Sequence, residues 1–208
     1  MIEAVIWDFG GVLTSSPFDA FARFERERGL PKDFLRTVNA RNHLDNAWAK
    51  IERGEIDHDA FDAAFAAECE ALGHEVRGAD VLQLLAGDFR PEMIEALRRI
   101  HARLKTGCIT NNLPAGGSDG TRALYRDEIM ALFHHVIESA KIGLRKPDPR
   151  IYAMMVETLG VDPGRCAYLD DLGVNLKPAR EMGMKTIKVG DPAAALAELE
   201  ALVGFPLR

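Results

Sequence analysis

Four groups of polar side chains in the sequence could act together on a small anionic molecule. Asp8 and Thr110 each end a short apolar run, Lys146 precedes a proline, and Asp170 is followed by Asp171. Taken singly, each has an ordinary structural explanation, because a carboxylate can cap a helix, a threonine can stabilise a turn and a lysine can lie in a solvated loop. Their order, and their placement at the ends of expected strands, favour a shared site in which one lysine and one metal ion neutralise an anion.

Short apolar runs alternate with helical patterns over most of the chain. The expected strands span residues 4–7, 107–110, 135–137, 166–169 and 186–189. Helices are expected between them, for example over residues 91–104 and 148–159, where Pro149 suits a first helical turn. This alternation predicts an α/β fold whose parallel sheet is covered by helices on both faces. Ligands of such sheets bind beyond the carboxyl ends of the strands, which is where the polar groups are expected.

The stretch from residue 18 to residue 89 interrupts the alternation. It is rich in helical patterns and contains no convincing strand. We therefore expect a helical cap domain, residues 18–89, inserted after the first strand. Residues 1–17 and 90–208 would then form the α/β core domain, in which strands and helices alternate without a break.

Composition narrows the classes of function. With 208 residues, 47% of them hydrophobic, the chain can bury a sizeable core. The net charge of −6 argues against a nucleic-acid groove, which needs a clustered basic surface. No basic leader precedes the first apolar run, which is too short for a signal peptide or membrane span, so we expect a cytoplasmic protein without a membrane partner. Three widely spaced cysteines without a CxxC pair indicate buried thiols rather than disulfides or a zinc site.

Several strings resemble the haloacid dehalogenase superfamily. They are WDFGGVL, ITNN, IGLRKPDPRIY and YLDDLGVNLKPAREMG, and they look like those of the phosphatase domain at the N-terminus of mammalian soluble epoxide hydrolases and of its free-standing bacterial relatives. The resemblance covers the whole chain and includes IERGEI in the helical insertion. It implies a three-layer, Rossmann-like parallel sheet core with a helical cap, a Mg²⁺ cofactor, and a small phosphorylated metabolite as substrate.

The resemblance also implies the residues of a metal and nucleophile site. Asp8 would attack phosphorus and form an aspartyl-phosphate that water then hydrolyses. Mg²⁺, which prefers oxygen ligands, would bind the Asp8 carboxylate, the backbone carbonyl of Gly10 and Asp171. Asp170 would lie next to these ligands without binding the metal itself. Asn175 would either hold a metal-bound water or form an ordinary hydrogen bond at the start of the following helix.

A second set of residues would bind the phosphoryl group. By the same resemblance, Thr110 and the amide of Asn111 would donate hydrogen bonds to phosphoryl oxygens. Lys146 would neutralise both Asp8 and the transferring group, because two anions must meet in this reaction. Arg145 competes for that role, but the Lys-Pro pair matches the superfamily pattern and Arg145 does not.

One position departs from the pattern. Most phosphatases of the superfamily carry an aspartate two residues after the nucleophile as general acid and base, whereas this chain has Gly10. Such a group is worth about a hundredfold to ten-thousandfold in rate. Three interpretations remain open. The substrate has a good leaving group, such as an acyl or anomeric phosphate; a cap residue such as His43, Asp45 or His58 supplies the proton; or the protein binds phosphorylated ligands with little turnover.

Two other activities found among similar proteins are disfavoured. Dehalogenation needs no metal, and the pair Asp170 and Asp171 would be an odd feature to retain beside Asp8 without a cation. Epoxide hydrolysis belongs to a separate C-terminal domain in the mammalian proteins. The expected activity is therefore that of a Mg²⁺-dependent phosphoric monoester hydrolase, while the sequence identifies neither its substrate nor its oligomeric state.

Overall fold

Five parallel strands form a single sheet in the computed structural model, which describes residues 1–114 and 120–208. The strands are β1 (Ala4–Trp7), β2 (Lys105–Thr110), β3 (His135–Glu138), β4 (Cys166–Asp170) and β5 (Lys185–Lys188). Their order across the sheet is β3-β2-β1-β4-β5, and every pairing is parallel. The five strands expected from the apolar runs are thus confirmed, with ends shifted by no more than two residues.

Strand β1 occupies the centre of the sheet. All four of its residues are buried, as the continuous apolar string AVIW predicts for a strand covered on both faces. Ile6 lies between Gly107 of β2 and Tyr168 of β4. The carboxyl ends of these three neighbouring strands therefore meet at one edge, where Asp8 continues from β1.

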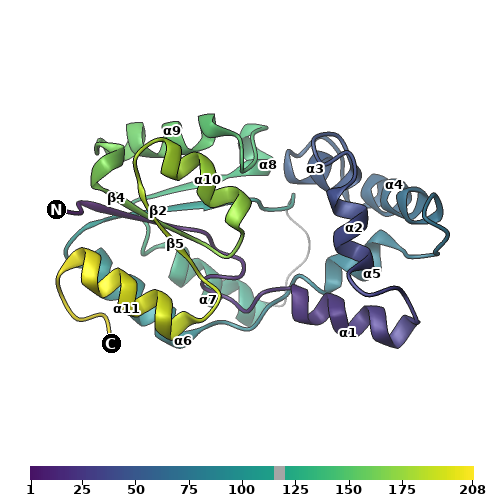
Figure 1. Ribbon diagram of the computed structural model, residues 1–208, viewed down its shortest axis with the longest axis horizontal. Helices are drawn as coiled ribbons and strands as arrows, with labels where there is room; N and C mark the ends of the chain where they lie inside the picture. The colour runs from purple at the N-terminus through teal and green to yellow at the C-terminus, as the bar shows by residue number, and fades with distance from the viewer. Residues whose placement is uncertain (115–119) are drawn as a thin grey trace.

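Helices cover both faces of the sheet (Figure 1). On one face lie α9 (Pro149–Leu159) and α10 (Gly173–Glu181), and on the other lie α6 (Pro91–His101), α7 (Gly120–Met130) and α11 (Pro192–Val203). Two further short helices are α8 (Ser139–Ile142) and η1 (Pro163–Arg165). We call the five strands together with these seven helical elements and their connections the sheet region. Each face carries its own cluster of buried apolar side chains. The arrangement is the three-layer α/β fold that the sequence predicts.

Five helices lie beyond the carboxyl ends of the strands and form what we call the helical segment (Figure 1). They are α1 (Phe18–Arg28), α2 (Phe34–Ala40), α3 (Ala47–Glu52), α4 (His58–Glu70) and α5 (Gly78–Gln83). The segment has a hydrophobic cluster of its own, in which Leu35, Phe61 and Phe65 are fully buried. The segment therefore contains a separate core.

The two chain crossings between the sheet region and the helical segment run side by side. Thr14 and Phe89 form an antiparallel bridge. Ser15 donates its backbone N–H to the carbonyl of Asp88 over 2.7 Å, and Arg90 donates to the carbonyl of Leu13 over 2.9 Å. The chain therefore enters and leaves the segment through one narrow, paired connection.

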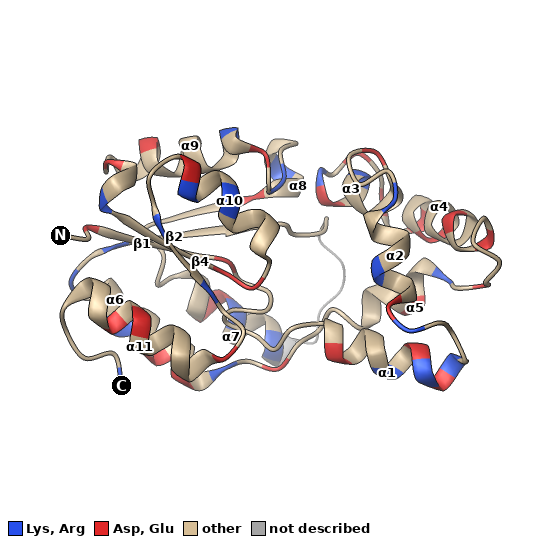
Figure 2. Ribbon diagram, in the orientation of Figure 1, with Lys and Arg blue, Asp and Glu red and all other residues tan. Residues whose placement is uncertain are grey.

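Charged residues of both signs are interspersed over the sheet region and the helical segment in the view of Figure 2. No helix among the described residues is both long enough and apolar enough to cross a membrane.

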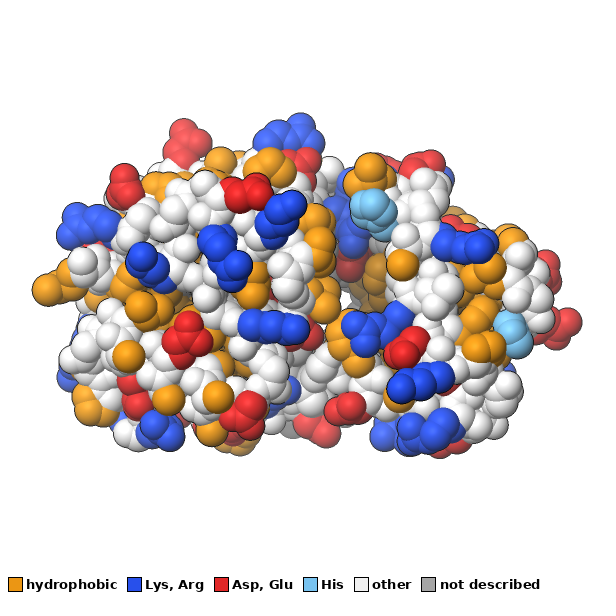
Figure 3. Space-filling view, viewed as in Figure 1, with side chains coloured by type: hydrophobic (Ala, Val, Ile, Leu, Met, Phe, Trp, Pro, Cys, Tyr) orange, Lys and Arg blue, Asp and Glu red, His pale blue; other side chains and the backbone are white. Residues whose placement is uncertain are grey.

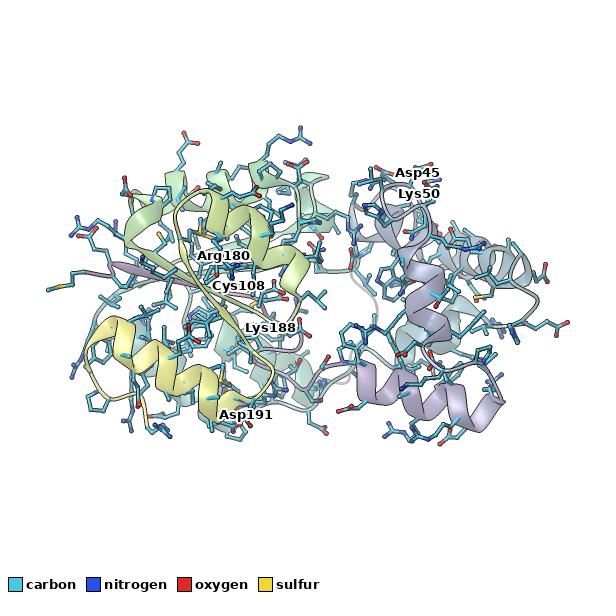
Figure 4. The ribbon with its side chains drawn as sticks, in the orientation of Figure 1. Asp45, Lys50, Cys108, Arg180, Lys188 and Asp191 are labelled. Carbon is cyan, nitrogen blue, oxygen red and sulfur yellow. The ribbon has the colours of Figure 1, made fainter. Side chains whose placement is uncertain are left out.

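The three cysteines are free and buried, as expected from their spacing. Burial raises the pKa of Cys69 to about 12 and that of Cys166 to about 11. Cys108 lies on β2, inside the sheet region (Figure 4). These thiols remain protonated at neutral pH and act as small apolar side chains.

Candidate active site

A buried lysine joins two strand ends. The Nζ atom of Lys146 lies 2.8 Å from Oδ1 of Asp8, after β1, and 2.8 Å from Oδ2 of Asp170, at the end of β4. The lysine side chain is only 1% exposed. Burial alone lowers its pKa, but the carboxylates of Asp170 and Asp8 raise the pKa above the usual lysine value. Lys146 is therefore a fixed positive charge.

Asp170 is held by a dense set of donors. Its Oδ1 accepts the backbone N–H of Leu172 over 2.8 Å, and its Oδ2 accepts Lys146 Nζ and the hydroxyl of Tyr168. The amide of Asn175 lies 3.1 Å from both oxygens. A carboxylate offers about four lone-pair directions, so the acceptor capacity of Asp170 is filled. Asn175, in the first turn of α10, thus contacts Asp170.

The turn after β1 is shaped around Asp171. Gly11 has a φ of +73°, and a Cβ atom there would lie 2.2 Å from Oδ2 of Asp171. A Cβ on Gly10 would meet nothing within 4 Å. Ser16 donates its hydroxyl to the same Asp171 oxygen over 3.2 Å, and Arg90 donates to the carbonyl of Gly11 over 2.8 Å. The glycine pair therefore lets the turn pass directly beside a carboxylate.

Three carboxylates gather at this point. Among the described residues, Asp8, Asp170 and Asp171 each offer an oxygen within 4.8 Å of the others. Burial raises the pKa of Asp8 to about 8, Lys146 opposes the rise, and the two other carboxylates add to it. Burial and the Asp170 charge also raise the pKa of Asp171. One lysine does not balance three carboxylates, and their hard oxygen donors fit a divalent cation such as Mg²⁺.

A cavity of about 780 Å³ opens between these strand ends and the helical segment (Figure 3). The sheet region contributes Asp8, Gly10 and Thr110 to its wall, and the helical segment contributes aromatic side chains such as Phe18 and Trp48. The cavity therefore brings the acidic cluster together with an apolar wall from a distant part of the sequence.

Asn111 links the lysine to the helical segment. Its Oδ1 accepts the backbone N–H of Lys146 over 2.8 Å, and its Nδ2 lies 3.1 Å from the carbonyl of the same residue. The same Nδ2 lies 3.2 Å from Oε2 of Glu52 on α3. The Asn111 side chain is thus occupied by protein groups, which leaves its backbone N–H as the amide that a ligand could use.

The three residues of the helical segment that the sequence suggests as proton donors occupy different places. His43 lines the cavity and is exposed. Asp45 pairs with Lys50 over 3.5 Å at the top of the helical segment in the view of Figure 4. Neither Asp45 nor His58 is part of the described cavity wall. The wall instead includes Glu52, which lies in the IERGEI string of the resemblance but to which the sequence assigned no role. Ser16, beside Asp171, was also not expected.

The parallel sheet, with a lysine joining two acids at the carboxyl ends of its strands, defines an α/β protein with an acidic, cation-compatible site. Residues 2–183 match the haloacid dehalogenase-like hydrolase family, and the chain belongs to that family. The expected family membership is therefore confirmed.

Curated relatives include long, multidomain proteins and a shorter phosphatase. The chain is 35% identical to mouse acyl-CoA dehydrogenase family member 10 and 32% identical to pig bifunctional epoxide hydrolase 2, each over 99% of this chain. It spans only 19% and 40% of those two proteins. It is also 32% identical to a phosphatase of Mycobacterium tuberculosis over 90% of this chain and 87% of that protein.

Solved structures share the fold. One is a family enzyme from Bacteroides thetaiotaomicron in complex with magnesium and inorganic phosphate, with a TM-score of 0.61 and 19% identity. The match covers 92% of this chain and 96% of that one. At this level of identity the likeness supports the fold alone.

The turn that contains Gly10 and Gly11 can be tested with a matched pair of variants. Gly11→Ala should weaken Mg²⁺ binding by about tenfold or more, because its Cβ would displace Asp171, and should cost about 1–3 kcal/mol of stability through its positive φ. Gly10→Ala should change stability by less than about 0.5 kcal/mol, since nothing lies within 4 Å of its Cβ. Calorimetric titration with Mg²⁺ and urea unfolding measure both effects. Equal behaviour of the two variants would contradict this account of the turn.

The raised pKa values predict pH-dependent metal binding. Below about pH 8 Asp8 holds a proton in the metal-free protein, and Mg²⁺ must displace it. Affinity should therefore rise by about tenfold per pH unit from about pH 6 and level off above about pH 8. Titration calorimetry in two buffers of different protonation enthalpy measures both the affinity and the protons released. Binding that is independent of pH, without proton release, would argue against Asp8 as a ligand.

Proposed function

We propose that the protein is a Mg²⁺-dependent phosphatase of a small phosphorylated metabolite, with Asp8 as its nucleophile. The observation that carries the proposal is the contact of Lys146 with Asp8 and Asp170 at 2.8 Å each. A buried positive charge fixed on a strand-end carboxylate offsets the repulsion that a phosphate dianion meets on approach. The M. tuberculosis phosphatase at 32% identity supports the same class of reaction.

The acidic cluster would hold the cation. Asp8, Asp171 and the backbone carbonyl of Gly10 would be the ligands, because the oxygens of Asp170 are already filled by donors. Asn175 would act through Asp170, by fixing its orientation. Bound Mg²⁺ would offset the negative charge of the nucleophile and of the phosphoryl group.

The chemistry would proceed in two displacements at phosphorus. Asp8 attacks phosphorus, the bond to the leaving oxygen breaks, and an aspartyl-phosphate forms. A water molecule then attacks the same phosphorus, which releases inorganic phosphate and restores the Asp8 carboxylate. Thr110 and the backbone N–H of Asn111 would donate to the phosphoryl oxygens, while Lys146 stays charged throughout.

Residues 18–89 would act as a cap domain over this chemistry, with residues 1–17 and 90–208 as the core domain. Support comes from the separate hydrophobic cluster of the helical segment and from the paired crossings at Thr14 and Phe89. A segment that the chain enters and leaves at one paired connection can move as a body once the contacts of Glu52 with Arg145, Asn111 and Ser139 open, and can thus admit a substrate and then exclude water. The cavity volume of about 780 Å³ suits a small metabolite.

Gly10 favours a second candidate function, that of a binding protein. Such a protein would keep the metal and phosphate contacts but lack efficient proton transfer. It would be stabilised by beryllofluoride, a phosphate mimic, without sustained turnover of any phosphoester.

A panel of acyl, sugar and alkyl phosphates with Mg²⁺ separates the two candidates. The wild type should release phosphate from some of them, and Asp8→Asn should lower that rate by about a thousandfold or more, because the amide cannot act as the nucleophile. Asp45→Asn is the matched control, since Asp45 is exposed and paired with Lys50, and it should retain wild-type rates. Stabilisation by beryllofluoride without Asp8-dependent turnover on any substrate would support the binding protein instead.

A further inference from the structure

Glu52 is the carboxylate of the cavity wall that the proposed metal site leaves without a role. Among the described residues that line the cavity, the acidic ones are Asp8, Asp171 and Glu52. The first two belong to the acidic cluster at the strand ends. Glu52 comes from the other side, at the C-terminal end of α3 in the helical segment. Its role therefore needs a separate explanation.

Contacts to the sheet region hold Glu52 in place. Its Oε2 lies 2.6 Å from Nε of Arg145 and 3.2 Å from Nδ2 of Asn111. Its backbone carbonyl accepts the hydroxyl of the fully buried Ser139 over 2.5 Å. Asn111 in turn binds both the N–H and the carbonyl of Lys146. The side chain of Asn111 thus bridges the Glu52 carboxylate and the backbone of Lys146, whose side chain contacts Asp8.

The direction of approach suits a proton donor to the leaving group. The nucleophile and the leaving oxygen lie roughly in line on opposite sides of phosphorus. Asp8 lines the cavity directly after β1, and Glu52 lines it from the last position of α3. Helix α3 lies beyond the carboxyl ends of the strands (Figure 1). A Cβ on Gly10 meets nothing within 4 Å, so that position leaves open space in the same cavity.

The surroundings of Glu52 allow it to carry a proton. Its side chain is 11% exposed, and burial raises its pKa above the usual value for glutamate. The nearby positive charges of Arg145 and Lys146 oppose that rise, and Arg53 also interacts with the Glu52 charge. A carboxyl group under these opposing influences can exist in both protonation states, as a general acid and base must.

From this geometry we propose that Glu52 is the general acid and base of the reaction, in the place of the side chain that Gly10 lacks. The inference rests on the proposed phosphatase function. In the first displacement the Glu52 carboxyl gives its proton to the leaving oxygen as the bond from that oxygen to phosphorus breaks. In the second, the Glu52 carboxylate takes a proton from the attacking water, so that phosphate leaves and the carboxyl is restored.

The test is the dependence of rate on the leaving group. The leaving group of p-nitrophenyl phosphate needs little protonation. With this substrate, the rate of Asp8 phosphorylation in Glu52→Gln should therefore stay within about threefold of the wild-type rate. The variant should be slower by about a hundredfold or more on an alkyl phosphate. Because water activation is also lost, p-nitrophenol should appear as a stoichiometric burst followed by slow turnover. Stopped-flow absorbance and phosphate release measure these quantities.

Two further sets of variants separate proton transfer from a structural role. Glu25 is a buried carboxylate of the same segment that accepts the backbone N–H groups of Asp33 and Leu35. Glu25→Gln should therefore produce neither a burst nor selective loss on alkyl phosphates. If Glu52→Gln folds poorly because it leaves Arg145 unpaired, a second comparison is used. It sets the single variant Arg145→Gln against the double variant Glu52→Gln/Arg145→Gln, in which neither charge of the pair remains. The double variant should show the same selective loss.

The outcomes are distinguishable. Equal slowing of Glu52→Gln on all leaving groups without a burst, or recovery of wild-type rates in the double variant, would mean that Glu52 only neutralises Arg145, and would overturn this inference alone. A wild type without Asp8-dependent phosphate release would overturn the proposed function as well.

Discussion

The site depends on one buried positive charge held between two carboxylates. Lys146 would be costly to bury alone, and Asp8 and Asp170 would repel each other without it. The contact is possible only because β1 and β4 are neighbours whose carboxyl ends meet at one edge. The geometry of this set of charges therefore depends on the pairing of the central strands.

A network of hydrogen bonds extends this constraint into the helices. Tyr168 and Asn175 donate to Asp170, and the hydroxyl of Tyr152, on α9, donates to the carbonyl of Asn175 over 2.7 Å. Burial and the neighbouring Asp170 charge raise the pKa of Tyr168, so its hydroxyl remains a donor. Two helices on the same face of the sheet thus fix the carboxylate that orients Lys146. Such a network can give the site a single geometry before any ligand binds.

The sheet and its acidic edge could be predicted from local patterns. Apolar runs ending in polar residues indicated where Asp8, Thr110 and Asp170 would emerge, because parallel strands align their carboxyl ends. The contacts of Glu52 and Ser16 could not be predicted, since each meets its partner only through tertiary packing across a long sequence separation. The sequence left two roles open for Asn175, and its contact with Asp170 depends on the entry angle of α10, which no local pattern specifies.

The central claim is that Asp8 forms a covalent bond to phosphorus. It is tested most directly by quenching the enzyme in acid during turnover of p-nitrophenyl phosphate with Mg²⁺, followed by mass measurement of the peptide that contains Asp8. The account predicts a mass increase of one phosphoryl group on Asp8, which is absent in Asp8→Asn. Steady phosphate release with no phosphoryl group on Asp8 at any quench time, or with the group on another residue, would contradict it.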